Sequence, residues 1–251
     1  MKTICFVGFH VVLILLAFRA TGAVVGVRVP NGGSVGNTFA QEPFSLESLG
    51  ITSSRQQQVY SASEFSSAMP NGGFITQILF RYDDIVGSTA TTFLPEVQID
   101  FAVTHRGPDQ LSTTFDENIG NSLAVAYPRG GLTLSGAPGS LSTRITFATP
   151  YFYNPTNGNL LLQIQNFQRT PFSNGPIFFP ASPLDAQNAA GDTVSRVFAY
   201  DANAATGTAD SLGLVTELVF TPVVPEPSTI ALTLIGICLL CFCRLRKKRG
   251  T

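Results

Sequence analysis

The stretch Leu94-Pro95-Glu96-Val97-Gln98-Ile99-Asp100-Phe101-Ala102-Val103-Thr104 decides the fold class of this chain. Apolar and polar side chains alternate along it with a period of two, which is the pattern of a β-strand with one buried face. The apolar positions, expected to face a core, are Val97, Ile99, Phe101 and Val103. The polar positions, expected to face solvent, are Glu96, Gln98, Asp100 and Thr104. The sequence therefore predicts a half-buried strand over residues 94–104.

Further segments rich in β-branched and aromatic residues repeat this theme, and turn residues separate them. The other expected strands are 74–82, 123–127, 143–147, 160–167, 196–200 and 212–221. The expected turns are Asn71-Gly72-Gly73, Pro128-Arg129-Gly130-Gly131, 154–159 and Asn174-Gly175-Pro176. Helical periodicity is limited to a turn around 62–68. Many short strands of this kind predict an all-β fold, specifically an antiparallel β-sandwich of jelly-roll type.

The N-terminus has the three parts of a secretory signal peptide. Met1-Lys2 is a short basic start, 4–18 is mostly apolar, and Ala20-Thr21-Gly22-Ala23 offers small residues for cleavage. This order predicts a signal peptide over 1–23, with signal peptidase and the general secretion machinery as partners. The alternative is an uncleaved N-terminal anchor.

The C-terminus also has three parts in series. Val224-Pro225-Glu226-Pro227-Ser228-Thr229 leads into the uncharged segment 230–243. A helix of that length spans only ~21 Å against a hydrocarbon core of ~30 Å, so a transmembrane helix over about 229–243 would be short. The basic cluster that follows is expected to keep the C-terminus in the cytoplasm. Its members are Arg244, Arg246, Lys247, Lys248 and Arg249.

This tail resembles the PEP-CTERM sorting signal of Gram-negative bacteria, which combines a Pro-Glu-Pro box, a short membrane helix and a terminal basic cluster. The resemblance implies that an exosortase-like membrane protease recognises Pro225-Glu226-Pro227 and releases the preceding domain to the cell surface or the extracellular matrix. It implies three regions, namely a signal peptide (1–23), an exported β domain (24–221) and the sorting signal (222–251). The alternative is a plain single-pass ectodomain that keeps its anchor.

Three segments of the body resemble PEP-CTERM surface proteins whose biochemical role is generally unassigned. They are Arg55-Gln56-Gln57-Gln58-Val59-Tyr60, Gly158-Asn159-Leu160-Leu161-Leu162-Gln163-Ile164 and Gly213-Leu214-Val215-Thr216-Glu217. This resemblance implies an exported β domain of the same sort and brings no catalytic residues with it.

The expected domain is acidic and has neither cysteine nor lysine. All 16 acidic residues of the chain except Glu226 fall within it, against eight arginines, so its net charge is about −7 while that of the chain is −1. Such a surface argues against nucleic acid and anionic lipid as partners, and the lack of cysteine excludes disulfides and thiolate sites. Five arginines are interpreted as surface or interstrand charge partners: Arg55, Arg81, Arg129, Arg144 and Arg169.

Catalytic and metal-binding patterns are weak. Gly32-Gly33-Ser34-Val35-Gly36 has the spacing of a nucleophile elbow, but it lacks the strand before and the helix after that this motif requires. His105 is expected to face solvent at a strand end. Within the expected domain 24–221, one histidine and no cysteine leave zinc without its usual ligands. The sequence therefore predicts no catalytic residue, no metal and no cofactor.

Oxygen-rich segments leave two alternatives open. The loop 201–210 has donors at alternating positions, as calcium loops do, but its spacing is not that of an EF-hand. The pairs Asp83-Asp84 and Asp116-Glu117 are the carboxylates that a secreted polysaccharide-acting enzyme would need. A candidate glycan contact consists of Tyr151, Tyr153 and Asn154, which combine aromatic rings with an amide. The prediction is a non-enzymatic exported protein, with extracellular polysaccharide as a candidate partner.

Overall fold

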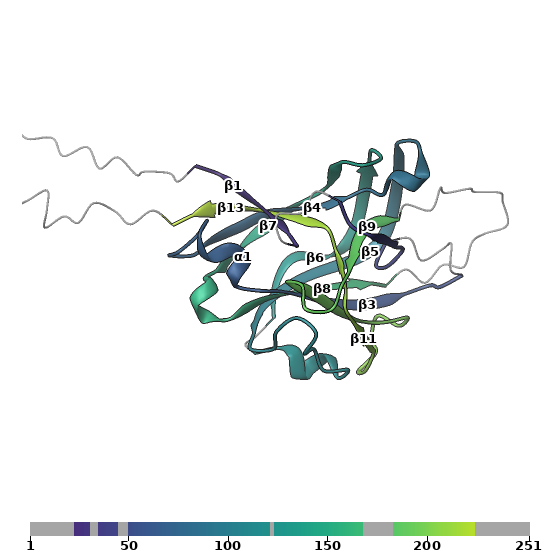
Figure 1. Ribbon diagram of the computed structural model, residues 1–251. Helices are drawn as coiled ribbons and strands as arrows, with labels where there is room; N and C mark the ends of the chain where they lie inside the picture. The colour runs from purple at the N-terminus through teal and green to yellow at the C-terminus, as the bar shows by residue number, and fades with distance from the viewer. Residues whose placement is uncertain (1–22, 31–34, 45–49, 121–122, 168–182, 224–251) are drawn as a thin grey trace, which may run out of the picture. The chain divides into compact units, whose positions relative to one another are not determined.

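Antiparallel strands make up most of the computed structural model, which describes residues 23–30, 35–44, 50–120, 123–167 and 183–223. The prediction of an all-β fold is thereby confirmed (Figure 1). Within these described ranges, no helix has the length and apolar character needed to cross a membrane. Apart from Ala23, the expected signal peptide lies outside the described residues, and so does the expected membrane helix at about 229–243.

A four-stranded sheet joins the two ends of the described chain. Its strands, in spatial order, are β1 (Val25–Val29), β13 (Thr216–Pro222), β4 (Gly73–Arg81) and β7 (Leu141–Tyr153). Val25 lies opposite Phe220, and Phe220 lies opposite Ile75. The first and last strands are therefore neighbours, although almost 200 residues separate them along the chain.

A second sheet has six strands. Their spatial order is β11 (Thr208–Asp210), β10 (Val194–Ala199), β3 (Ser54–Tyr60), β8 (Asn159–Asn166), β5 (Ala90–Thr104) and β6 (Ala124–Gly136). A small third sheet contains β12 (Leu212–Leu214), β9 (Leu184–Asn188) and β2 (Thr38–Ala40). The helical elements are α1 (Ser63–Ser66) and the 3-10 turns η2 (Asp84–Val86), η3 (Phe115–Asn118) and η4 (Pro155–Asn157).

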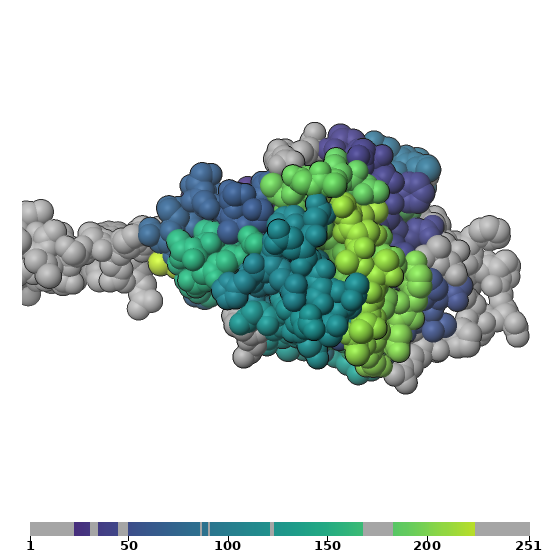
Figure 2. Space-filling model, turned by 60° about the horizontal axis from the view of Figure 1, so that its bottom comes forward, coloured from purple at the N-terminus to yellow at the C-terminus, as the bar shows by residue number. Residues whose placement is uncertain are grey.

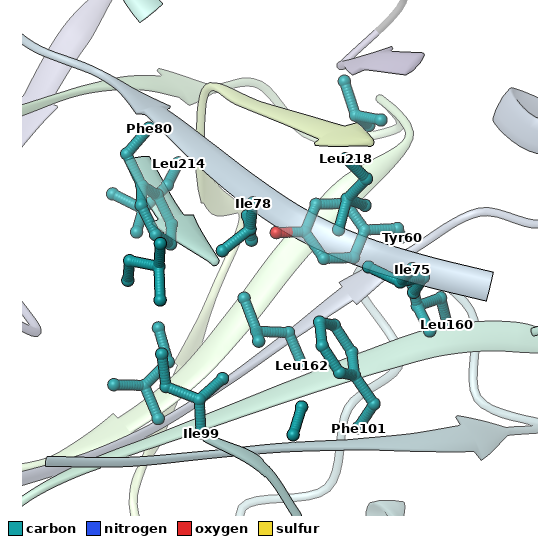
Figure 3. Close-up of a cluster of buried hydrophobic side chains, with 14 of the residues drawn as sticks. Tyr60, Ile75, Ile78, Phe80, Ile99, Phe101, Leu160, Leu162, Leu214 and Leu218 are labelled. Carbon is teal, nitrogen blue, oxygen red and sulfur yellow. The ribbon is translucent and has the colours of Figure 1, made fainter. Parts of the chain in front are cut away.

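The four- and six-stranded sheets contribute to one apolar core. Ile78 and Leu218 come from the first sheet, while Ile99, Phe101 and Leu162 come from the second, and all five are essentially inaccessible to solvent. Figure 3 shows these side chains pointing toward one another between the strands. Burial of this apolar surface is the main favourable term that holds the sheets together.

Several local predictions agree with the strands. The expected strand at 74–82 corresponds to β4, that at 160–167 to β8 and that at 196–200 to β10. The helical turn expected around 62–68 is α1, and the turn at 154–159 contains η4. Asn174-Gly175-Pro176 lies outside the described residues.

Two of the predicted boundaries are wrong. The segment Pro128-Arg129-Gly130-Gly131 is not a turn, because β6 runs through it; Tyr127 lies opposite Ile99 and Gly130 opposite Val97, so a bulge absorbs an extra residue. Proline and glycine are tolerated there because β6 is an edge strand. The expected strand 212–221 is two strands, which join different sheets on either side of Val215.

The prediction for the polar face of residues 94–104 is also wrong over its second half. Val97, Ile99 and Phe101 face the core as expected, but Asp100 and Thr104 are each only 1% exposed. A second apolar cluster covers this outer face of the sheet. It contains Val59, Ala102, Leu111, Phe115, Leu161 and Val197.

Candidate functional site

The folded domain ends directly before the expected sorting signal. Pro222, the last residue of β13, lies opposite Gly73, and the backbone N–H of Val223 donates to the carbonyl of Gly72 at 3.1 Å. The sorting residues 224–229 and the basic cluster 244–249 lie outside the described residues. A protease that recognises Pro225-Glu226-Pro227 would therefore find this box two residues beyond the last strand.

The candidate glycan contact is divided by the fold. Tyr153 is fully buried and its hydroxyl donates to the carbonyl of Gly158 at 2.9 Å, so its ring cannot stack on a ligand without leaving the core. Burial also raises the pKa of Tyr153. Tyr151 is partly buried and stacks on Phe101 at 5.4 Å between ring centroids. Asn154 caps η4 by accepting from the backbone N–H of Thr156 at 3.0 Å.

A polar network lies on the outer face of the six-stranded sheet, beneath the segment 105–120 that follows β5. The sequence pattern did not predict this network. Gln57, Gln163 and Asp100 lie opposite one another on β3, β8 and β5. The amide oxygen of Gln163 accepts from Gln57 at 3.0 Å, and its amide nitrogen donates to Asp100 at 3.1 Å. The only local signal is the presence of Gln and Asp at strand positions next to apolar residues.

Arg55 closes this network at one side. Its guanidinium donates to Gln163 at 2.9 Å and to the backbone carbonyl of Ala204 at 2.9 Å, and it pairs with Asp116 at 3.3 Å. The same group lies over the ring of Phe115, 4.5 Å from its centroid. Of the two roles predicted for Arg55, the structure agrees with the interstrand one, because its side chain bonds to Gln163 on the neighbouring strand and is only 11% exposed.

The segment between β5 and β6 forms the cover. Asn118 is fully buried and its amide donates to Gln57 at 3.0 Å, while its oxygen accepts from the backbone of Ser112 at 2.7 Å. Figure 2 shows this segment in teal beside yellow-green residues from the C-terminal part of the domain, and Thr114 forms a β-bridge with Thr206 there. Burial raises the pKa of Asp100, although Gln163 and Gln98 donate to it and Arg55 attracts it.

A second buried charge cluster surrounds Arg196. Its guanidinium pairs with Asp210 at 3.0 Å and with Glu42 at 3.4 Å, and Tyr200 donates to Glu42 at 2.7 Å. Burial raises the pKa of Glu42, but the bond from Tyr200 and the attraction of Arg196 outweigh it, so this pKa lies below its usual value. Burial and the adjacent carboxylate of Glu42 raise the pKa of Tyr200 to about 12.

A hollow of about 150 Å³ lies beside this cluster, with Asp109, Ser195, Arg196 and Asp210 among its lining residues. Asp109 has a left-handed backbone conformation (φ 59°). Its backbone N–H donates to the hydroxyl of Ser195 at 2.8 Å, and its carboxylate accepts from the backbone N–H of Gly191 at 2.7 Å. Ligand pockets usually measure about 300–1,000 Å³, so this hollow suits a few waters or one small polar group.

The remaining carboxylates make structural contacts. Asp83 accepts from the backbone N–H of Ile85 at 2.8 Å and Asp84 pairs with Arg81 at 3.6 Å. Glu117 pairs with Arg106 at 3.3 Å, and Asp116 pairs with Arg55 at 3.3 Å. Neither adjacent pair therefore faces a common cleft as two free carboxyl groups. Arg81 on β4 also forms an ion pair with buried Asp185 on β9, so of its two predicted roles it has the interstrand one.

The two carboxylates at the ends of the loop 201–210 have different partners. Asp201 accepts from the backbone of Asn203 at 3.0 Å, and Asp210, at the other end of the loop, pairs with Arg196. Across the described part of the chain, no three His, Cys, Asp or Glu side chains gather as a metal site. His105 is exposed directly after β5, whereas Ser34 lies outside the described residues.

Comparison with known proteins identifies the tail. Residues 223–247 match the PEP-CTERM protein-sorting motif, which confirms the resemblance of the C-terminus. A signal of this kind indicates an exported protein that is sorted to the cell surface and processed by an exosortase-type membrane protein. The chain matches no curated protein and no solved structure.

Proposed function

We propose that this chain is a non-enzymatic exported protein whose β domain is sorted through its C-terminal signal to the cell surface or the extracellular matrix. The observation that carries the proposal is the sorting motif at 223–247, which begins one residue after β13 ends. Two residues separate the end of β13 from Pro225, so the strands of the described domain do not include the box. Pro225 and Pro227 favour an extended backbone in this short strip.

The proposed route uses both ends of the chain. The signal peptide at 1–23 directs export through the general secretion machinery, and signal peptidase leaves a mature start near Val24. The apolar helix at about 229–243 halts in the inner membrane, and the basic cluster holds the C-terminus in the cytoplasm. An exosortase-like protease then acts at Pro225-Glu226-Pro227 on the outer side.

The proposed architecture of the exported domain is a jelly-roll sandwich. If β1, β3, β4, β5, β6, β7, β8 and β13 are counted as strands one to eight, the two sheets have the orders 1-8-3-6 and 2-7-4-5. These orders support two interleaved Greek keys, as in a jelly roll. The segment 184–214 is then an insertion that adds β10 and β11 beside β3 and forms most of the third sheet.

A non-enzymatic role is supported by the way the domain uses its charges. Asp84, Asp116 and Glu117 each pair with an arginine, and Asp100 accepts from amides under the cover. Such groups stabilise the fold and are not positioned for acid and base catalysis. Extracellular polysaccharide stays a candidate partner, with Tyr151 and Asn154 as the remaining accessible part of the predicted contact.

The test compares the intact mass and the cellular location of the wild type with those of the variant Pro225→Ala/Glu226→Ala/Pro227→Ala in native cells. The expected wild type lacks the mass beyond the Pro-Glu-Pro box and lies outside the inner membrane, whereas the variant keeps its tail and stays in that membrane. The matched control is Pro95→Ala/Glu96→Ala/Pro128→Ala, which removes the same residue types from the domain surface and should be sorted normally.

Two outcomes would favour the alternatives. An intact tail in the membrane in both the wild type and the box variant would make the protein a plain anchored ectodomain. Turnover of a glycan by the purified domain would favour a secreted enzyme that uses carboxylates.

A further inference from the structure

An apolar row crosses the outer face of the four-stranded sheet at the end where β13 stops. Phe74 and Phe152 lie opposite each other on β4 and β7, with ring centroids 5.2 Å apart, and they are 43% and 44% exposed. Thr221 lies opposite Phe74 on β13, and the register that pairs Val25 with Phe220 places Val24 next to Thr221. Val24 is 67% exposed. Residues directly opposite in antiparallel strands point to the same face, so these side chains form one surface.

This surface lies where the chain enters and leaves the domain. Val223, which is 40% exposed, binds Gly72, and the ring of Phe152 lies close to Gly72 as well. Figure 1 shows the start of β1 and the end of β13 side by side at the same edge, near α1. Four exposed large apolar residues therefore gather around the two ends of the described domain.

None of the side chains in the row itself is charged. In the next row of the sheet, Gly26 on β1 lies opposite Val219 on β13, and Val219 lies opposite Gln77 on β4. Charged groups begin at that row, because the carboxylate of Glu217 lies 2.7 Å from where a Cβ atom on Gly26 would be and Arg144 donates to Gln77 at 3.2 Å. An exposed apolar patch of this kind, rimmed by polar residues, marks an interaction surface.

The length of the connecting chain limits what can cover this surface. Six residues, 224–229, separate Val223 from the apolar segment that starts at 230. Fully extended, they reach about 21 Å. While that segment is in the bilayer, the end of the domain that carries Phe74 and Phe152 is therefore held within this distance of the lipid surface. The polar headgroup zone itself occupies several ångströms of that space, since it accounts for about 5–8 Å on each side.

We propose that Phe74 and Phe152, with Val223 beside them, dock on the interface of the bilayer during the stage at which the tail is membrane-bound. This inference rests on the proposed function, because it requires the tail to be inserted. The contact is apolar and uncharged, so it suits zwitterionic lipid even though the domain is acidic overall. Docking orients the domain with its β1 and β13 ends toward the membrane and so presents the Pro-Glu-Pro box at the lipid surface, where a membrane protease acts.

The absence of tryptophan from the chain allows a clean test. The chain from Val24 onward, as signal peptidase is proposed to leave it, carries Phe152→Trp and is reconstituted in vesicles of phosphatidylcholine and phosphatidylethanolamine, with and without lipids brominated near the headgroup. Phe93→Trp is the matched control, because Phe93 is 60% exposed and lies on β5 eleven residues before Thr104. That separation is about 36 Å along the strand, and Thr104 lies beside Gly158 at the Phe152 end of the domain.

The expected result is a blue-shifted emission and at least twofold quenching by brominated lipid for Phe152→Trp, with little quenching for Phe93→Trp. Adding Phe74→Ser to the Phe152→Trp variant should reduce the quenching. Flotation of the same vesicles reports insertion of the tail separately. A chain that floats but shows no quenching at either position would overturn docking and leave the proposed route intact.

Two other outcomes also count against docking. A blue shift at position 152 without quenching by brominated lipid would show that protein covers the row, either a second copy of the chain or a protease. Failure of the chain to float would contradict the membrane segment itself, and the docking proposal would fall with it.

Discussion

Gln163 donates to Asp100 at 3.1 Å on the face of the six-stranded sheet that the alternation of residues 94–104 assigns to solvent. Asp100 is 1% exposed and Gln163 is 2% exposed, because the segment 105–120 packs over them. A carboxyl group that is buried among amides loses hydration, and this loss favours its neutral form. Burial is accordingly the leading cause of the raised pKa of Asp100.

Replacing Asp100 with asparagine should change how stability depends on pH. Because the pKa of Asp100 is raised in the folded state, the native protein holds this proton more tightly than the unfolded chain. Its contribution to stability is therefore fully present below the ordinary aspartate pKa and is lost as the pH rises through the folded-state pKa. Asp100→Asn has no proton to lose, so its melting temperature should rise relative to that of the wild type as the pH increases from the ordinary aspartate pKa through the raised folded-state pKa.

The control for this prediction is Asp201→Asn, which removes an exposed carboxylate that accepts one local backbone bond. The difference in melting temperature between Asp201→Asn and the wild type should not grow with pH in the same way. If the melting temperatures of Asp100→Asn and the wild type change with pH in parallel, Asp100 is not a buried carboxyl group that retains its proton.

Arg196→Met should be strongly destabilising. The change leaves Glu42, which is 7% exposed, without its cation, and removes the pair with Asp210. Breaking a buried ion pair from one side costs about 3–5 kcal/mol, because the remaining charge stays desolvated. Urea unfolding of the purified domain measures this loss.

Arg28→Met is the matched control for Arg196→Met. Arg28 pairs with Glu217 at 2.6 Å, but its side chain is 50% exposed, so the expected loss is about 1 kcal/mol or less. Adding Glu42→Gln to Arg196→Met should restore part of the stability. If the two arginine variants lose equal stability, the cluster around Arg196 is not buried as described.

Gly213→Ala should destabilise the domain through overpacking. A Cβ atom at this position would lie 2.3 Å from a methyl carbon of Val194, which is fully buried. Forcing an extra methyl group into a packed core costs about 1–3 kcal/mol. Gly130→Ala is the control, because its nearest neighbour would lie at an ordinary 3.6 Å, and its effect should stay within about 0.5 kcal/mol.

The double variant Gly213→Ala/Val194→Ala discriminates between overpacking and other causes. It should recover part of the melting temperature that Gly213→Ala loses, because the smaller side chain at 194 makes room for the new methyl group. No recovery would mean that the close approach of β12 to β10 is not the reason for the glycine.

Phe65→Ala should show how much the short helix α1 contributes. Phe65 is fully buried and its ring contacts those of Tyr60, Tyr153 and Phe220, which come from both large sheets. Removing a buried phenylalanine costs about 3–5 kcal/mol. Phe93→Ala, at a position that is 60% exposed, should cost far less in the same unfolding measurement.

Local pattern was a good guide to some elements and a poor guide to others. β4 and β8 each contain a run of three large apolar residues, 78–80 and 160–162, so their own residues identify them. β9 reads Leu-Asp-Ala-Gln-Asn and has little strand propensity, yet it pairs with β2 and β12. Its strand conformation depends on partners that are distant in sequence, and a single-segment pattern does not contain them.

The sequence alone determined the all-β class, the absence of cysteine and lysine from the domain, and the C-terminal sorting signal, because each depends on the order of neighbouring residues. Only the tertiary structure decided that Asp100 and Arg55 are covered, and that Phe74 and Phe152 lie beside the exit of β13. Gln163 meets Asp100 across 63 residues of chain and Arg55 across 108. Burial and charge pairing of this kind result from contacts between distant segments, and these contacts exist only once the sheets have assembled.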